Sequence, residues 1–165
     1  MIFYESMKMV NDKFNIIRDS NEQKGHGWTF IKTDRCLGTT IEKLPTGDYT
    51  IKGLEKEFTI ERKGRISEWA TNLFEDRFHR ELERLDKFEH PYLILEFPFE
   101  HMELYPKFSG IPSYLWSSLK VKGPQLIKAY HELRLSHPRI RVDFVGPSGK
   151  AYALSLFKRI FDLYN

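Results

Sequence analysis

The sequence has little cysteine: Cys36 is the only one in 165 residues. A single cysteine excludes an intrachain disulfide framework and a cysteine-rich zinc site, and it is typical of a protein in a reducing compartment. The six histidines show no paired metal spacing on any one expected element, which argues against a histidine zinc site as well.

Long hydrophobic runs are also missing. No stretch of about 18 apolar residues occurs, and the first twelve residues are mixed and charged, without the apolar core of a signal peptide. We therefore expect no export, no membrane span and no membrane partner. The expected location is the cytoplasm, including the nucleoid, or the host cytoplasm if the chain is encoded by a phage.

Neither sign of charge is in large excess. The 26 basic and 23 acidic residues leave a net charge of +3, so affinity for phosphate groups has to come from local clustering of cations. Glycine-rich phosphate loops of the Walker or dinucleotide-binding type are absent too. Chemistry driven by a bound nucleotide therefore lacks support.

The length and a hydrophobic content of 41% are enough for one sizeable core, so we expect a single domain over residues 1–165. Strands are predicted at 13–18, 49–51, 58–63, 92–97 and 139–145, with one or two short strands in 29–42 broken around Gly38. Helices are predicted at 68–88, 125–135 and 149–164, with Ser67 and Ser148 as N-caps of the first and last. Strands alternating with helices indicate the α/β class.

Two segments have a more specific interpretation. The apolar run 92–97 lies between two prolines and is typical of a buried, central strand. Residues 98–124 are rich in proline and aromatic residues without a steady period, so we expect an ordered but irregular excursion that forms a flap or an interface. In the helix predicted at 68–88, the apolar residues at helical spacing are Ala70, Phe74, Phe78, Leu82 and Leu85.

The candidate site begins with a predicted hairpin. Side chains alternate faces along 58–63, so Glu61 and Lys63 share a face. Asp48 opens the preceding strand, and a turn over 52–57 brings it beside Glu61. Two carboxylates can hold one hard cation such as magnesium, and a lysine beside them can stabilise charge on a phosphoryl group. This pattern predicts a metal-dependent nuclease.

A second acidic pair, Asp19 and Glu22, follows the strand predicted at 13–18. The order of the motifs resembles the XPF-type nuclease domain of the restriction-endonuclease-like, PD-(D/E)xK superfamily, from about Phe14 to the last helix. The motifs that carry the resemblance are Asp19-Ser20-Asn21-Glu22, Leu44-Pro45-Thr46-Gly47-Asp48-Tyr49, Ile60-Glu61-Arg62-Lys63, Arg77-Phe78 with Glu81, and Tyr92-Leu93-Ile94-Leu95-Glu96.

The resemblance implies a restriction-endonuclease-like core, with a central mixed β-sheet flanked by helices, and a Mg²⁺- or Mn²⁺-dependent DNA endonuclease. Carried over by position, it implies metal binding by Asp48 and Glu61, supporting acidic roles for Asp19 and Glu22, and a catalytic role for Lys63.

Several arginines have two interpretations. Arg62 matches the family's arginine, but strand alternation puts it opposite Glu61, so its role is structural or DNA-facing. Arg77, Arg80 and Arg84 follow helical spacing and form either a DNA-binding ridge or a solvated face paired with neighbouring acids. Glu96 either faces the site or is a paired structural carboxylate.

The sequence also departs from the family pattern. Ser67 stands where relatives usually have an aspartate, so an acidic role there passes to Glu68 or is lost. Asn21 replaces an arginine, and the tandem helix-hairpin-helix module of larger relatives is missing. The choice among flap, junction and single-stranded DNA is therefore not inherited from the resemblance, whereas a role in DNA repair or recombination is expected. The alternatives are a non-catalytic module of the same fold that binds DNA or a partner, and cleavage of RNA. A homodimer through 98–124 or the last helix is a further expectation.

Overall fold

The computed structural model describes residues 12–22 and 26–165. Its central feature is a six-stranded sheet with the order β2-β1-β3-β4-β5-β6. The strands are β1 (Phe14–Asp19), β2 (Cys36–Glu42), β3 (Tyr49–Ile51), β4 (Phe58–Lys63), β5 (His90–Leu95) and β6 (Arg141–Phe144). β3 is antiparallel to both of its neighbours, and the other adjacent pairs are parallel. The sheet is therefore mixed.

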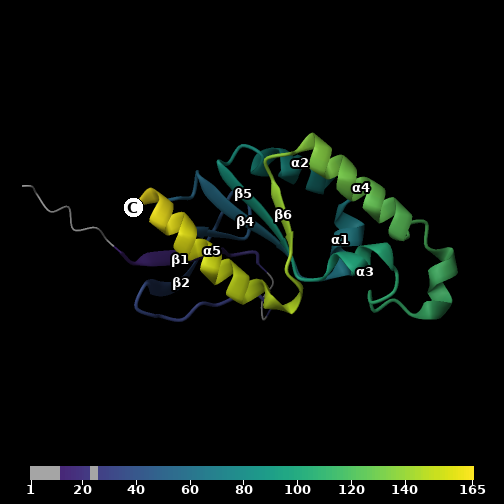
Figure 1. The fold of residues 1–165 in the computed structure, drawn as a ribbon, viewed down its shortest axis with the longest axis horizontal. Coiled ribbons are helices and arrows are strands. Elements are labelled where there is room, and N and C mark those ends of the chain that lie inside the picture. The colour runs from purple at the N-terminus through teal and green to yellow at the C-terminus, as the bar shows by residue number, and fades with distance from the viewer. Residues whose placement is uncertain (1–11, 23–25) are drawn as a thin grey trace, which may run out of the picture.

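Helices cover both faces of this sheet (Figure 1). They are α1 (Ile66–Asn72), α2 (Asp76–Leu85), α3 (Phe99–Glu103), α4 (Gly123–Ser136) and α5 (Gly149–Tyr164), with short 3₁₀ turns η1 (Ser113–Ser118) and η2 (Gly146–Ser148). α5 packs on one face and α1 to α4 on the other. Within the described ranges no helix is long and apolar enough to span a bilayer.

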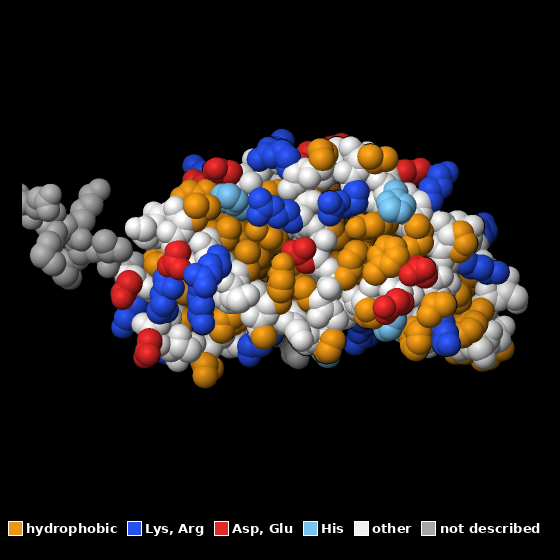
Figure 2. Space-filling view, viewed as in Figure 1, with side chains coloured by type: hydrophobic (Ala, Val, Ile, Leu, Met, Phe, Trp, Pro, Cys, Tyr) orange, Lys and Arg blue, Asp and Glu red, His pale blue; other side chains and the backbone are white. Residues whose placement is uncertain are grey.

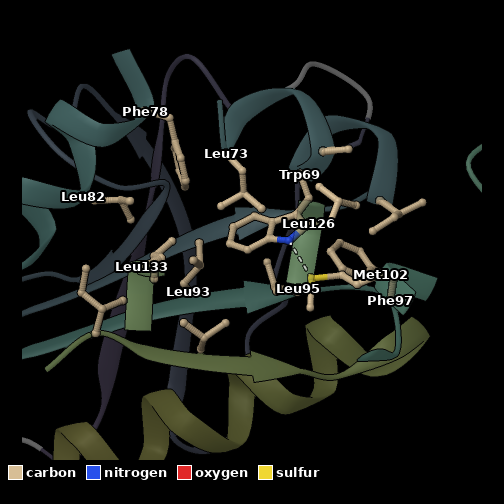
Figure 3. Close-up of a cluster of buried hydrophobic side chains, with 14 of the residues drawn as sticks. Trp69, Leu73, Phe78, Leu82, Leu93, Leu95, Phe97, Met102, Leu126 and Leu133 are labelled. Atoms are coloured by element: carbon tan, nitrogen blue, oxygen red, sulfur yellow. Dashed lines mark hydrogen bonds between the residues drawn. The ribbon is translucent and has the colours of Figure 1, made fainter. Parts of the chain in front are cut away.

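Each face has its own hydrophobic core. On the α1 to α4 side the fully buried Trp69 donates from its indole nitrogen to the sulfur of Met102 at 3.1 Å (Figure 3). On the other side Phe157 of α5 packs edge-on against Phe30 and Phe58, with ring centroids 5.5 and 5.7 Å apart. β5 supplies alternate residues to both cores. The prediction of a strand buried on both faces and flanked by strands is confirmed.

Each predicted strand is present, but several bounds differ: β1 is shifted by one residue, β5 covers His90–Leu95 instead of 92–97, and β6 covers Arg141–Phe144 instead of 139–145. The hairpin of β3 and β4 forms with its turn at 52–57. Residues 29–42 contain one strand, β2, which continues through Gly38 with a positive φ of 103° and an irregular register against β1. Glycine tolerates this backbone conformation, so it bends the strand without ending it.

The single helix predicted at 68–88 is wrong. Two helices, α1 and α2, are separated at Leu73–Glu75, where Leu73 is buried and Phe74 is 49% exposed. The ring Nε2 of His79 lies 2.8 Å from the Leu73 carbonyl oxygen, so it satisfies a group that the break leaves without a helical partner. No proline or glycine marks the break, which is why periodicity alone missed it.

The proposed N-cap at Ser67 is wrong as well. α1 begins at Ile66, with Arg65 at the N-cap position and no side-chain capping bond. Ile66 is only 4% exposed and belongs to the core, so its burial favours a start before Ser67. Ser148 is the N-cap of α5 as predicted, although its side chain makes no capping bond. The irregular excursion at 98–124 contains α3 and η1.

Gly47 fixes the chain just before Asp48 and provides a test of the fold. Its φ is +80°, and a Cβ added there would lie 1.9 Å from Thr59 Oγ1, whereas Gly53 has a φ of +94° with nothing within 4 Å. Gly47→Ala is expected to lower the free energy of unfolding by about 3 kcal/mol or more, because strain and overpacking add. Gly53→Ala, the matched control, should cost only about 1 kcal/mol. Urea denaturation measures both, and equal losses would contradict the assignment.

Candidate active site

Asp48 is held by the backbone of two strands, β1 and β4. Its amide donates to the carbonyl of Ile60 at 2.8 Å, and its own carbonyl accepts from the amide of Asp19 at 2.8 Å. Its carboxylate Oδ2 accepts from the amide of Arg62 at 2.8 Å. Asp48 therefore links the ends of β1 and β4, and its side chain is fixed alongside β4.

Glu61 and Lys63 share a face of β4, as alternation predicted. Lys63 Nζ lies 2.9 Å from Glu61 Oε1 and 3.9 Å from Glu68 Oε1, and it sits 4.8 Å from the centre of the Phe78 ring. Glu61 and Lys63 are only 4% and 6% exposed. Asp48, Glu61 and Lys63 line one cavity of about 410 Å³.

The cavity is rich in charges of both signs. Six acidic residues line it, namely Asp19, Glu22, Asp48, Glu61, Glu68 and Glu81, together with five basic ones, Lys43, Arg62, Lys63, Arg77 and Arg84. An incoming phosphate would be repelled by the acidic wall unless further positive charge were present.

Proton affinities reflect this crowding. Burial, followed by the charges of Glu61 and Glu22, raises the pKa of Asp48 well above its usual range. Burial raises the pKa of Glu61 to about 7; Glu81 also raises it and Lys63 opposes the shift. Burial acts to lower the pKa of Lys63, but the negative charges of Glu61 and Glu68 outweigh it and raise this pKa. The two buried carboxylates are therefore short of neutralising charge.

The donor set fits a hard cation that keeps some of its water. Glu61 Oε2 is buried and has no hydrogen-bond partner in the described part of the chain, and a cation beside Asp48 and Glu61 would satisfy it. Within residues 12–22 and 26–165 no group of three or more histidine, cysteine or acidic side chains forms a ready metal cage. Magnesium, which is usually held by one or two carboxylates with water and substrate oxygens, matches such a site.

Asp19 and Glu22 reach the same cavity but already have protein partners. Asp19 Oδ1 accepts from the amide of Leu44 at 2.8 Å and its Oδ2 from the amide of Asn21 at 3.2 Å. Glu22 lies 3.9 Å from the guanidinium of Arg62, and its charge, after burial, raises the pKa of Tyr49. The sequence did not predict that Tyr49 lies beside this acidic pair, because its position in a short buried strand indicated only core packing.

Arg62 points away from Glu61, as alternation predicted. Its guanidinium pairs with Glu96, donates to the carbonyl of His26 at 2.7 Å and lies 3.9 Å from Glu22. It also lies 4.8 Å from the ring centre of Trp28, which is buried. Glu96 is thus a paired carboxylate. These contacts join β4, the end of β5 and the segment that follows β1; DNA binding by Arg62 stays a prediction.

One stripe of α2 contributes to the cavity wall. Arg77, Glu81 and Arg84 are spaced i, i+4 and i+7 and all line it. Arg80 is exposed and is not among the lining residues, because its position on the helix is rotated further from the buried face. Its role in binding DNA stays a prediction.

Glu68 lies near Lys63. The family pattern has its acidic residue one position earlier, where this chain has Ser67. Glu68 lines the cavity, whereas Ser67 is not among its lining residues. Glu68 therefore brings an acidic group to the cavity, and its taking over the family's acidic role stays a prediction.

The raised pKa of Glu61 predicts how stability depends on pH. Between the ordinary value of 4.5 and about 7 the folded protein binds more protons at Glu61 than the unfolded chain does. The free energy of unfolding of metal-free protein should therefore fall as the pH rises through this window. Urea denaturation in EDTA at a series of pH values measures it. Glu61→Gln should reduce the slope and the exposed control Glu83→Gln should not; a slope of opposite sign would refute the assignment.

The contacts of Arg62 predict that its replacement lowers the stability of the fold. Arg62→Gln leaves Glu96 without its cationic partner, so the free energy of unfolding should fall by about 3 kcal/mol. Arg80→Gln removes an exposed guanidinium and should change it by less than about 0.5 kcal/mol. Denaturation midpoints of the two variants check this, and coinciding midpoints would argue against the role.

Comparisons with known proteins identify the fold and the family of this chain. A search of curated protein sequences gave no significant match. Among solved structures, XPF from Aeropyrum pernix aligns with a TM-score of 0.57 and 20% identity, covering 88% of this chain and 60% of that one. XPF from Aeropyrum pernix in complex with DNA aligns with a TM-score of 0.58 and 20% identity, covering 93% and 67%.

These structures confirm the expected fold, a restriction-endonuclease-like core in which helices flank a central mixed sheet. This chain spans about three fifths of the first of them. The model of the ERCC4 domain matches residues 18–142, which is most of the chain and contains every charged residue of the cavity. The protein therefore belongs to the ERCC4 domain family.

Proposed function

We propose that this protein is a divalent-metal-dependent DNA endonuclease that hydrolyses phosphodiester bonds at the cavity containing Asp48, Glu61 and Lys63. Membership of the ERCC4 domain family supports a DNA nuclease or DNA-binding role. The single observation that supports the catalytic part of the proposal is the buried pair of carboxylates, Asp48 and Glu61, whose negative charge Lys63 neutralises only in part.

Asp48 and Glu61 are the proposed ligands of Mg²⁺ or Mn²⁺, and Asp19 and Glu22 are supporting acids. When bound, the ion would lower the pKa of a water molecule and neutralise charge on the phosphoryl oxygens. Asp48 is suited to this role because the Arg62 amide orients its carboxylate. Glu61 is suited because Oε2 is buried without a donor, while Oε1 holds Lys63.

Lys63 is the proposed electrostatic catalyst. Its ammonium is oriented by Glu61 and Glu68 and is kept charged by both. A fixed positive charge beside the reacting phosphate stabilises the negative charge that develops in the transition state. Because a raised pKa keeps the amine protonated, Lys63 acts here as a charge and not as a general base.

Arg77 and Arg84 are candidates to bind phosphates flanking the cut. Arg77 is 79% exposed at its side chain and pairs with Glu75 at 3.6 Å. Both arginines line the cavity, and such contacts would make DNA binding dependent on salt concentration. Arg80 and Arg62 were predicted from the sequence to share this role, and salt titration of single variants distinguishes the four residues.

The comparisons bear on the class of the substrate, and its structure has to be measured. One solved XPF structure contains DNA, and this supports DNA as the substrate. Selectivity for flaps, junctions or single strands is open to a side-by-side comparison of those substrates. RNA belongs in the same comparison, since no described contact reads a 2′-hydroxyl.

The second candidate is a non-catalytic DNA-binding module. The observation that favours it is the close ion pair of Lys63 with Glu61, which engages the ammonium and one of the two oxygens of the Glu61 carboxylate. Calorimetry with Mn²⁺ separates the two candidates. Heat of binding that Glu61→Gln abolishes supports the nuclease, whereas no binding to the parent protein favours the module.

Dimerisation stays a prediction. Phe157, Ile160 and Phe161 of α5 are buried against the sheet, so much of its apolar area serves the fold. Figure 2 shows hydrophobic side chains gathered between α5 and α4 on the viewed face. Light scattering measures the oligomeric state directly.

The cleavage test uses purified protein with plasmid, single-stranded, flap and four-way-junction DNA in Mg²⁺ or Mn²⁺. Cutting is expected, and EDTA should stop it. Asp48→Asn, Glu61→Gln and Lys63→Met should each lower the rate about 100-fold or more, since each removes a ligand or the fixed charge.

Glu83→Gln and Lys87→Met are matched controls, because both side chains are exposed and neither lines the cavity. They should cut at the parent rate. Cutting that persists in Glu61→Gln would falsify the assignment of the site.

A further inference from the structure

A second cavity, of about 490 Å³, lies at the carboxyl ends of the parallel strands β4, β5 and β6. Residues just after these strands form its floor, and His101 and Phe108 form one wall. In α/β sheets this edge is where ligands commonly bind, because loops from neighbouring strands converge there.

This cavity is linked to the proposed active site through shared lining residues. A smaller pocket between them shares Gly64 and Arg65 with the second cavity. The same pocket shares Glu22, Arg62 and Glu68 with the active-site cavity. The three hollows therefore lie next to one another, from the proposed reaction centre to the second cavity.

Phe108 is presented to solvent in a strained backbone conformation. Its φ is +66° and it is 55% exposed. Its ring stacks on His101, with centroids 4.4 Å apart and planes inclined by 14°. A bulky residue with positive φ is an outlier that costs free energy, and burial of the ring does not compensate here. An exposed ring held in a fixed orientation suits a stacking partner.

The surrounding charges suit a nucleic acid strand. Lys107 Nζ lies 5.2 Å from the Phe108 ring centre, and Lys107 and Arg65 are exposed. The acidic residue at the cavity, Glu96, is already paired with Arg62. Aromatic rings beside mobile cations bind unpaired bases by stacking and their phosphates by charge, whereas the bases of a duplex are stacked on one another.

We propose that this groove binds an unpaired DNA strand adjacent to the cleaved phosphate, with Phe108 as the residue on which a base stacks. The proposal deepens the nuclease function and rests on it for the position of the reacting phosphate. The proposed phosphate contacts are Arg65, which lines the groove, and Lys107, which lies beside Phe108 at its edge.

The test measures DNA binding by the full chain carrying Glu61→Gln, so that cleavage does not interfere. The probes are a fluorescein-labelled single strand, a blunt duplex, and a duplex with a single-stranded flank that contains 2-aminopurine. Adding Phe108→Gly should weaken binding of the single strand and the flanked duplex about tenfold, and should prevent quenching of 2-aminopurine. Binding of the blunt duplex should change less than twofold.

The variants keep the result interpretable. Glycine adopts the positive φ of residue 108 without strain, so Phe108→Gly is expected to fold. Phe108→Trp should retain binding, because the larger ring also stacks. Tyr114→Ala is the matched control, since Tyr114 is 80% exposed and does not line the groove, and it should bind like the Glu61→Gln parent.

Equal single-strand binding with and without Phe108 overturns the proposal, as does an equal loss on all three probes or no single-strand binding by the parent. A change from dimer to monomer with Phe108→Gly in light scattering would instead identify the groove as an interface between copies, and also overturns it. Failure of the proposed nuclease function can be told apart from failure of the groove proposal. It appears as the absence of cleavage by protein in which Glu61 is intact.

Discussion

The proximity of two buried carboxylates is the constraint on which the site depends. Burial makes ionisation of Asp48 and of Glu61 unfavourable, and neighbouring charge adds to this, from Glu61 on Asp48 and from Glu81 on Glu61. A folded protein tolerates such a pair only if the surrounding structure holds it in place. Lys63 neutralises part of the charge, and the remainder is the physical basis for expecting a cation. The local backbone can be understood as the framework that keeps this unfavourable pair together.

That framework is built into the sheet. β3 is short, but it lies between β1 and β4 and runs against both. Asp48 precedes it and bonds through its backbone to both neighbours, so the carboxylate position follows from strand pairing and not from a mobile loop. Gly47 permits the close approach of this segment to Thr59. A site on paired strands is preorganised, which is what electrostatic stabilisation of a transition state requires.

The sequence predicted those parts of the structure that follow from local periodicity. Alternation along β4 correctly put Glu61 and Lys63 on one face and Arg62 on the other. It did not predict the helix break at 73–75, because the break is set by packing of Leu73 and Phe78 and by a contact from His79, none of which has a local signal. The partners of Arg62 are 34 and 36 residues away in the chain, at Glu96 and His26. Such long-range pairing depends on the tertiary structure.

The break between α1 and α2 has a geometric consequence. It lets α2 take a direction of its own, with Arg77, Glu81 and Arg84 along the cavity, while α1 stays packed beside β4. The three-residue connection therefore acts as a spacer between the floor of the cavity and one of its walls. Changing the length of that spacer would alter the width of the opening while leaving the strands and the carboxylate pair in place. In this architecture the width of the cavity and the position of the carboxylate pair are set by separate segments of the chain.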